Sequence, residues 1–164
     1  MKTEEMIAVA YIDTPLGNLE IKGDENGLAS VLFVDKDDQE VSEIIPVELQ
    51  ETVRQIREYF EGKRTEFILK LAPQGTDFQK RVWHELLKIP FGKTFSYQYI
   101  ANQLGDPKVI RAAASANGKN PISIIIPCHR IIGKDGSLTG YAGGLHRKKW
   151  LLEHENPSSQ KTLF

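Results

Sequence analysis

The spacing of apolar residues changes once along this chain, and that change limits the folds it can adopt. Up to residue 35, short β-prone runs are separated by turn signals: "MIAVAYID" (6–13), "GNLEIKG" (17–23) and, after the turn signal "DENG", "LASVLFVD" (28–35). From residue 76 onward, apolar residues recur at helical spacing instead. The pattern predicts an α+β fold, in which an antiparallel sheet is followed by a mainly helical part.

One helix is expected within the first part. Leu49, Val53, Ile56 and Phe60 fall at helical spacing, and Gly62 follows as a stop signal. The segment "RTEFILKL" (64–71) then predicts a further strand. This half contains no catalytic set of side chains, so we expect it to give structural support.

A domain boundary is predicted near residue 74. The segment "LAPQGT" (71–76) places Pro73 close to Gly75, as in a linker. The charge changes sign at the same place, because residues 1–70 carry 8 basic and 16 acidic residues whereas residues 71–164 carry 13 and 6. We therefore expect domains at 1–74 and 75–156, and a flexible tail at 157–164.

Composition excludes several classes of protein. The 164 residues are 40% hydrophobic but hold no run of about 18 apolar residues, and the N-terminus does not resemble a signal peptide. A single cysteine forms no internal disulfide and suits a reducing compartment, and the four histidines are too scattered to suggest a metal site. We therefore expect a cytoplasmic protein with no membrane partner and no metal. The basic stretch 108–149 either attracts a polyanion or forms an ordinary solvated surface.

The second half predicts a sequence of capped helices. Thr76 with Gln79 forms a capping box before a helix whose buried stripe is Phe78, Val82, Leu86 and Ile89. Ser96 can cap the next helix, which Gly105 ends, and Asp106 followed by Pro107 begins another. Two helices joined by a tight glycine turn indicate a helix-turn-helix, for which a plain helical hairpin is the alternative.

The second helix of this pair, "KVIRAAASANG" (108–118), consists mostly of small residues. Small side chains allow a helix to approach a groove closely, and Arg111 is the one long side chain that could probe a base stack. The alternative is an alanine-rich helix packed on a neighbour, with Arg111 in solvent.

The only cysteine, Cys128, lies in "IIIPCHRIIG" (124–133). The three isoleucines predict a short buried strand, which Pro127 would end. A free cysteine in an apolar run is usually an inert core residue. Here His129 could act as a base, and Arg130 raises the local positive potential. Asn120 could fix a turn nearby, and Glu155 offers a carboxylate to orient the histidine.

Four segments together strongly resemble the O6-alkylguanine-DNA alkyltransferases, also called methylated-DNA–protein-cysteine methyltransferases. They are "TDFQKRVWHELLKIPFGKTFSY", "FSYQYIANQLGDPKVIRAAASANGKNPI", "IPCHRIIG" and "GYAGGLHRKKWLLEHE". The resemblance covers residues 75–156 almost without gaps. It implies a ribonuclease H-like N-terminal domain and a C-terminal domain with a winged-type helix-turn-helix and the active-site cysteine.

The resemblance implies a role for each matched residue. Cys128 accepts the alkyl group, His129 acts as base through a water molecule, and Glu155 orients His129. Tyr97 assists base flipping and donates a proton to the leaving guanine, and Asn120 braces the turn beside the nucleophile. The expected DNA contacts are Arg111, which fills the gap left by the flipped nucleotide, with Tyr97, Lys108, Ala112, Ser115, Asn117 and Arg130.

The substrate pocket is expected at Ile131, Tyr141, Ala142 and Gly143. The family usually has serine where this chain has Ala142, so a hydroxyl contact is lost while the backbone N–H is retained. The segment Asn117-Gly118 also departs from relatives that carry longer or charged residues there, which bears on DNA affinity more than on chemistry.

The implied activity is direct-reversal DNA repair. A monomer binds the minor groove of double-stranded DNA, flips out an O6-alkylguanine or an O4-alkylthymine, and transfers the alkyl group irreversibly to Cys128. The thioether product cannot be cleaved, so each molecule acts once, and no cofactor is needed. The alternatives are a non-catalytic lesion-binding relative, which generally lacks the cysteine, a transcription regulator and a thiol hydrolase. The protein would be cytoplasmic and nucleoid-associated when acting, or nuclear in a eukaryote.

Overall fold

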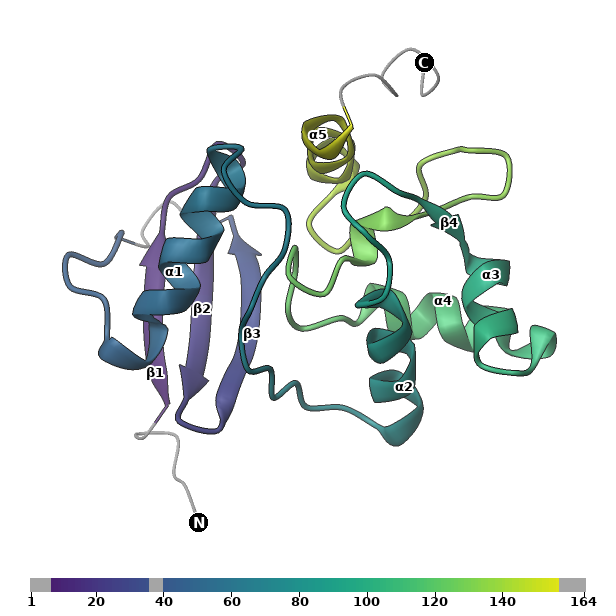
Figure 1. Cartoon of the computed structure of the whole chain (residues 1–164), viewed down its shortest axis with the longest axis horizontal. Coiled ribbons are helices and arrows are strands. Elements are labelled where there is room, and N and C mark those ends of the chain that lie inside the picture. The colour runs from purple at the N-terminus through teal and green to yellow at the C-terminus, as the bar shows by residue number, and fades with distance from the viewer. Residues whose placement is uncertain (1–6, 36–39, 157–164) are drawn as a thin grey trace. The chain divides into compact units, whose positions relative to one another are not determined.

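The computed structural model describes residues 7–35 and 40–156, so the predicted tail at 157–164 lies outside the described residues. Contacts between residues divide the chain into two compact units. Unit 1 is the N-terminal part up to Gln74 together with Pro121–Ser123, and unit 2 comprises Gly75–Asn120 and the chain from Ile124 onward. The predicted α+β class is confirmed (Figure 1).

Unit 1 is built on a three-stranded antiparallel sheet in the order β1-β2-β3. The strands are β1 (Ala8–Ile12), β2 (Asn18–Asp24) and β3 (Gly27–Val34). Leu19 and Ile21 of β2 are both fully buried, which confirms the alternation expected from the sequence. Helix α1 (Val47–Phe60) packs on β1 and β2 through its buried face (Figure 1). Tyr59 is completely buried, whereas Phe60, which was expected in the stripe, is only half-buried.

The strand predicted at 64–71 is wrong. Only Leu71 pairs with the sheet, through an isolated bridge to Leu28. The backbone of Ile68 is bonded instead by the amide side chain of Gln55, which donates to its carbonyl at 3.1 Å and accepts from its N–H at 2.9 Å. Because this side chain satisfies both backbone groups of Ile68, the middle of the segment needs no strand partner.

A short piece of chain far along the sequence completes unit 1. The N–H of Val31 donates to the Pro121 carbonyl at 2.9 Å, and the N–H of Ser123 donates to the Val31 carbonyl at 2.9 Å. Residues 121–123 therefore extend the sheet at β3 by a parallel bridge between Val31 and Ile122.

The helices of unit 2 begin where the sequence predicts. Helix α2 (Asp77–Leu86) has a complete capping box from Thr76 and Gln79, and helix α3 (Tyr97–Gln103) is capped by Ser96. Gly105 adopts a φ of 88°, which reverses the chain before the short helix η2 (Pro107–Val109) and helix α4 (Ile110–Gly118). The Asp106 side chain caps η2 at the N–H of Lys108, at 2.9 Å. Two helices joined by a tight turn result, as expected.

The strand predicted at Ile124–Ile126 is wrong, although all three isoleucines are buried. The segment forms a turn in which Ile124 has a φ of 73°, a rare conformation for a β-branched residue. The turn leads into η3 (Cys128–Arg130) and β5 (Ile131–Ile132), which pairs in parallel with β4 (Phe95–Ser96). Helix α5 (Leu145–Glu155) closes the described chain. None of the helices in residues 7–35 and 40–156 is long and apolar enough to cross a membrane.

Candidate active site

Cys128 is the first residue of η3 and is 6% exposed. Its N–H bonds to the Ile126 carbonyl at 2.8 Å, and the buried side chain of Asn120 donates to the same carbonyl at 2.7 Å. Asn120 therefore fastens the turn that presents the cysteine. Burial raises the pKa of the Cys128 thiol, while the Asn120 side chain and the charge of Lys148 act in the opposite direction. The resting sulfur is thus a protonated thiol that needs a base.

His129 and Glu155, which are distant in sequence, lie together in the interior. The Nε2 atom of His129 is 2.7 Å from Oε2 of Glu155, and the histidine is completely buried. Burial lowers the pKa of His129 despite the attraction of Glu155, and the cations Arg130 and Lys148 lower it further. The ring is therefore neutral near pH 7, with its Nε2–H donated to the carboxylate. The Nδ1 atom has no hydrogen-bond partner among the residues that the structure describes, so its lone pair is available to a proton.

The structure corrects the expected role of Arg130. Its guanidinium group is buried and donates to both oxygens of Glu155, at 2.7 and 3.0 Å, and to the Ile89 carbonyl at 2.7 Å. It also lies over the Phe91 ring, 5.9 Å from the centroid. A side chain engaged in this way cannot reach DNA, so the prediction of a DNA contact at Arg130 is wrong. The guanidinium group instead holds the carboxylate that orients His129.

Asn117, also expected at the DNA, is buried at 5% exposure. Its Nδ2 atom is 3.4 Å from the Cys128 carbonyl, and its Oδ1 atom has no hydrogen-bond partner in the described part of the chain. The α4 register turns this residue toward the cysteine and away from the surface. Asn117 therefore belongs to the surroundings of Cys128, and the predicted DNA contact is wrong.

Four of the other predicted DNA contacts share one exposed face. Lys108, Arg111, Ala112 and Ser115 are all exposed, and they follow one another at spacings of three, one and three residues on η2 and α4. Ala113 and Ala116 form the opposite, buried face. The Trp83 indole, an unpredicted core residue, donates to the Ala116 carbonyl at 2.9 Å and fixes the helix to α2. A narrow, basic, small-residue surface is thereby presented to solvent.

The predicted pocket residues lie around the loop that precedes α5. Ile131 is buried, Tyr141 and Gly143 are half-buried, and Ala142 is exposed. Arg147 donates to the Gly143 carbonyl at 3.0 Å. Tyr97 reaches the same loop, since its hydroxyl oxygen accepts from the Thr139 side chain at 3.1 Å.

Sequence reasoning missed Lys148, which is completely buried on α5. Its Nζ atom donates to the Thr139 carbonyl at 2.6 Å, and it is the cation that influences the Cys128 thiol. A signal was present in the sequence. Lys148 precedes the buried residues Leu151, Leu152 and Glu155 by three, four and seven positions, which places it on the same helix face.

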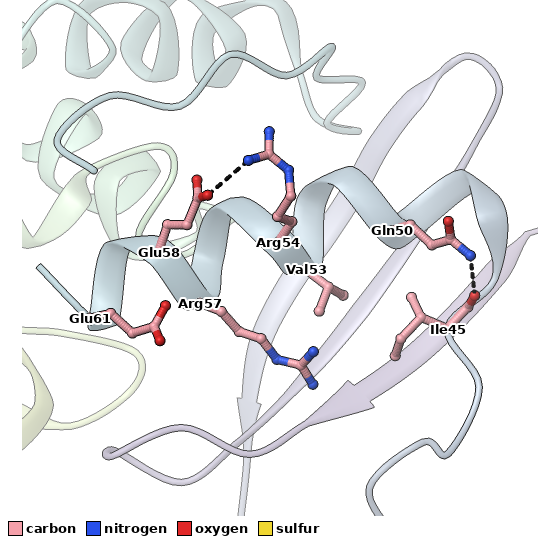
Figure 2. Close-up of a pocket in the computed structure, with 7 residues that line it drawn as sticks. All are labelled: Ile45, Gln50, Val53, Arg54, Arg57, Glu58 and Glu61. Carbon is pink, nitrogen blue, oxygen red and sulfur yellow. Dashed lines mark hydrogen bonds and ion pairs between the residues drawn. The ribbon is translucent and has the colours of Figure 1, made fainter. Parts of the chain in front are cut away.

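A surface hollow on unit 1 lacks the chemistry of a reactive site (Figure 2). Two of its charged groups pair with each other, Arg54 with Glu58 at 2.8 Å, and the neutral amide of Gln50 donates to the Ile45 carbonyl at 3.1 Å. No cysteine, histidine, serine or threonine lines it. The described reactive groups are instead those of unit 2 around Cys128.

Models of known families match nearly the whole chain. The model described as "6-O-methylguanine DNA methyltransferase, ribonuclease-like domain" matches residues 7–73. The model described as "6-O-methylguanine DNA methyltransferase, DNA binding domain" matches residues 77–157.

Individual proteins give the same result. A methylated-DNA–protein-cysteine methyltransferase of Methanosarcina barkeri is 47% identical over 151 residues, which cover 88% of this chain and 94% of that protein. One of Mycobacterium bovis is 46% identical and covers 96% and 98%. The crystal structure of the Mycobacterium tuberculosis O6-methylguanine methyltransferase superposes with a TM-score of 0.82 at 43% identity, covering 93% and 94%. A structure of the M. tuberculosis protein in complex with DNA gives 0.81 at 44% identity, covering 91% and 92%.

Proposed function

The chain belongs to the 6-O-methylguanine-DNA methyltransferase family, and from this membership and the site geometry we propose how its residues carry out the reaction. Its activity is the repair of DNA by direct reversal, in which an alkyl group passes from the nucleic acid to a cysteine of the protein. DNA is therefore its partner. The substrate we propose is O6-alkylguanine in duplex DNA, and O4-alkylthymine is a second candidate for the same chemistry.

Cys128 is the acceptor of the alkyl group. The support for this assignment is the buried set Cys128, His129 and Glu155. In it the neutral imidazole donates its Nε2–H to the carboxylate, and Nδ1 has no hydrogen-bond partner among the described residues. In the proposed reaction Nδ1 takes the thiol proton, directly or through a water molecule. Glu155, held by Arg130, stabilises the imidazolium that forms.

The thiolate then attacks the alkyl carbon. A carbon–sulfur bond forms as the bond from that carbon to O6 of guanine breaks, and the electron pair of the broken bond stays with the base. Tyr97 donates a proton toward N3 of the leaving guanine. The product is a thioether on Cys128 and an unmodified guanine, so each molecule acts once.

The target base must leave the DNA double helix to reach the buried sulfur atom of Cys128. We propose that Lys108, Arg111, Ala112 and Ser115 face the minor groove, with Arg111 occupying the space of the flipped nucleotide. The pocket for the flipped base is formed by Ile131, Tyr141, Ala142 and Gly143, and the N–H of Ala142 serves where relatives have serine. The protein acts as a monomer, in the cytoplasm and on the nucleoid.

Mass spectrometry after incubation with a duplex containing O6-methylguanine tests this function. We expect Cys128 to gain the mass of one methylene group, with at most one equivalent per molecule and no turnover. Cys128→Ser should abolish transfer and leave DNA binding nearly intact. Unmodified protein that still binds the lesion would contradict the proposal and favour a non-catalytic lesion-binding role.

A further inference from the structure

Lys148 is a buried cation whose charge has no carboxylate partner within residues 7–35 and 40–156. The residue is completely excluded from solvent, and no ion pair between described residues includes it. Burial lowers its pKa to about 8. A buried charge is costly unless polar groups replace its water. The groups that do so here are two backbone carbonyls, of Thr139 at 2.6 Å and of Gly140 at 3.4 Å.

These two carbonyls belong to an exposed segment. Thr139 and Gly140 are both exposed, and Gly140 has a φ of 36°. Exposed residues with few apolar contacts are free to move. The ammonium group beneath them therefore supplies a fixed attachment for the loop that leads to Tyr141.

The same segment positions Tyr97. The Thr139 carbonyl that accepts from Lys148 also lies 3.4 Å from the Tyr97 hydroxyl group as an acceptor. The Thr139 side chain in turn donates to that hydroxyl oxygen at 3.1 Å. A continuous chain of hydrogen bonds thus runs from Lys148 through Thr139 to the hydroxyl group of Tyr97.

We propose that Lys148 is a positioning residue for alkyl transfer, which fixes the Thr139–Gly140 backbone and thereby the hydroxyl group of Tyr97. This inference rests on the proposed function, in which Tyr97 protonates the leaving guanine. In this proposal Lys148 acts through the Thr139 backbone and not by its own contact with the base. Its charge also attracts the Cys128 thiolate, and this second effect does not pass through Tyr97.

A double-mutant cycle of Lys148→Met and Tyr97→Phe separates the two effects. The quantity to measure is the first-order transfer rate constant at saturating methylated duplex, obtained by mass spectrometry of quenched samples. In the otherwise unmodified protein, Lys148→Met should slow transfer roughly tenfold or more. In the Tyr97→Phe background, the slowing caused by Lys148→Met should be at least about threefold smaller. The attraction between Lys148 and the Cys128 thiolate is the same with Tyr97 or Phe at position 97. It therefore cancels when the two slowing factors are divided by each other.

The control is Lys93→Met, which removes the same charge from an exposed position of unit 2 and should leave the rate constant unchanged. Equal slowing by Lys148→Met in both backgrounds, or no slowing in either, would overturn the inference. If the unmodified protein itself fails to alkylate Cys128, the proposed function fails instead, so the two failures are distinguishable.

A measurement on the unmodified protein decides the matter if Lys148→Met does not fold. The ¹³C resonance of the Thr139 carbonyl and the side-chain resonances of Lys148 are followed together against pH. Both should titrate with one midpoint of about 8, distinct from those of Cys128 and His129, the titratable groups coupled to this lysine. If the Thr139 carbonyl resonance does not shift as Lys148 titrates, the proposed hydrogen bond between Lys148 and the Thr139 carbonyl is refuted.

Discussion

Glu155 accepts hydrogen bonds from two side chains at once, His129 and Arg130. Burial alone would raise its pKa, but His129, through its hydrogen bond and through its charge once the ring is protonated, acts together with Arg130 to hold that pKa well below its ordinary value of 4.5. The carboxylate is therefore ionised at every pH at which the protein works, and Arg130 depends on it for charge compensation.

Replacing this carboxylate should destabilise the fold and slow the chemistry. Glu155→Gln leaves the buried guanidinium group of Arg130 without its counter-charge, so we expect the free energy of unfolding to fall by about 3–5 kcal/mol. Urea denaturation measures the loss. The matched control is Glu153→Gln, half-buried on the same helix, which should change stability by roughly 0.5 kcal/mol or less. Equal effects of the two substitutions would contradict the described cluster.

The same groups predict how stability depends on pH. The folded-state pKa of His129 lies below its ordinary value of 6.5, so the unfolded chain binds this proton first as the pH falls. Stability should therefore decline below pH 6.5, and again below pH 4.5 as the unfolded chain protonates Glu155 ahead of the folded one. Urea midpoints recorded from about pH 7.5 to about pH 4 test this order. In Glu155→Gln the second decline should shrink, and an unchanged profile would refute the assignment.

At the scale of elements, η2 and α4 present one exposed face, and its residues should differ in what they do. Lys108 is an exposed surface cation, whereas Arg111 projects from a run of small side chains. Lys108→Ala should weaken DNA binding about equally for lesion and undamaged duplex, and reduce the slope of log K against log salt by about 1. Fluorescence anisotropy at several salt concentrations measures this slope. A loss confined to the lesion duplex would show that Lys108 does not act through phosphate.

Arg111→Ala should instead weaken binding and base flipping while it leaves the sulfur reactive. Alkylation of Cys128 by a free-base analogue, which needs no flipping, should keep its rate, and transfer from duplex DNA should slow. Fluorescence of 2-aminopurine beside the lesion reports flipping directly. The control is Arg54→Ala in α1, whose side chain is paired with Glu58. Similar losses with both substrates would indicate damage to the site and not to flipping.

Local signals located the helices well and the irregular segments poorly. The capping box at Thr76 and the caps at Ser96 and Asp106 were predictable because each involves residues two or three positions apart. Residues 64–71 and 124–126 carry β-prone side chains, yet neither forms a strand. Their backbone partners are the Gln55 side chain in the first case and, in the second, a turn beside Asn120, and no local pattern encodes either arrangement.

At the scale of the whole molecule, the chain crosses between its two units more than once. Residues 121–123 belong to unit 1, whereas their neighbours Asn120 and Ile124 belong to unit 2. Two backbone hydrogen bonds at Val31 join residues 121–123 to strand β3. A single boundary near residue 74 therefore describes most of the chain, but the structure also assigns this short distant segment to unit 1.

Removing one of these bonds should cost measurable stability. Val31→Pro removes the N–H that donates to the Pro121 carbonyl and keeps three side-chain carbons, whereas Val31→Ala keeps that N–H and deletes two buried methyl groups. We expect Val31→Pro to lower the free energy of unfolding by about 1–3 kcal/mol more than Val31→Ala does. Urea denaturation followed by circular dichroism gives both values. Equal losses of unfolding free energy in the two variants would mean that the hydrogen bond from Val31 to Pro121 contributes nothing to stability.

The sequence by itself determined the α+β order, the capped helices and the family, because these depend on residue types at short, fixed spacings. It also singled out Cys128, His129 and Glu155. Only the tertiary structure decided which cations are exposed and which are buried beside Cys128 and His129. Arg111 and Arg130 are the same residue type in basic surroundings, yet one is exposed and the other is bonded to a carboxylate 25 positions away. Lys148 likewise became a buried group through carbonyls of a neighbouring loop. Burial and partners arise from contacts between distant segments, and these set the energy of a charge far more strongly than its neighbours in sequence do.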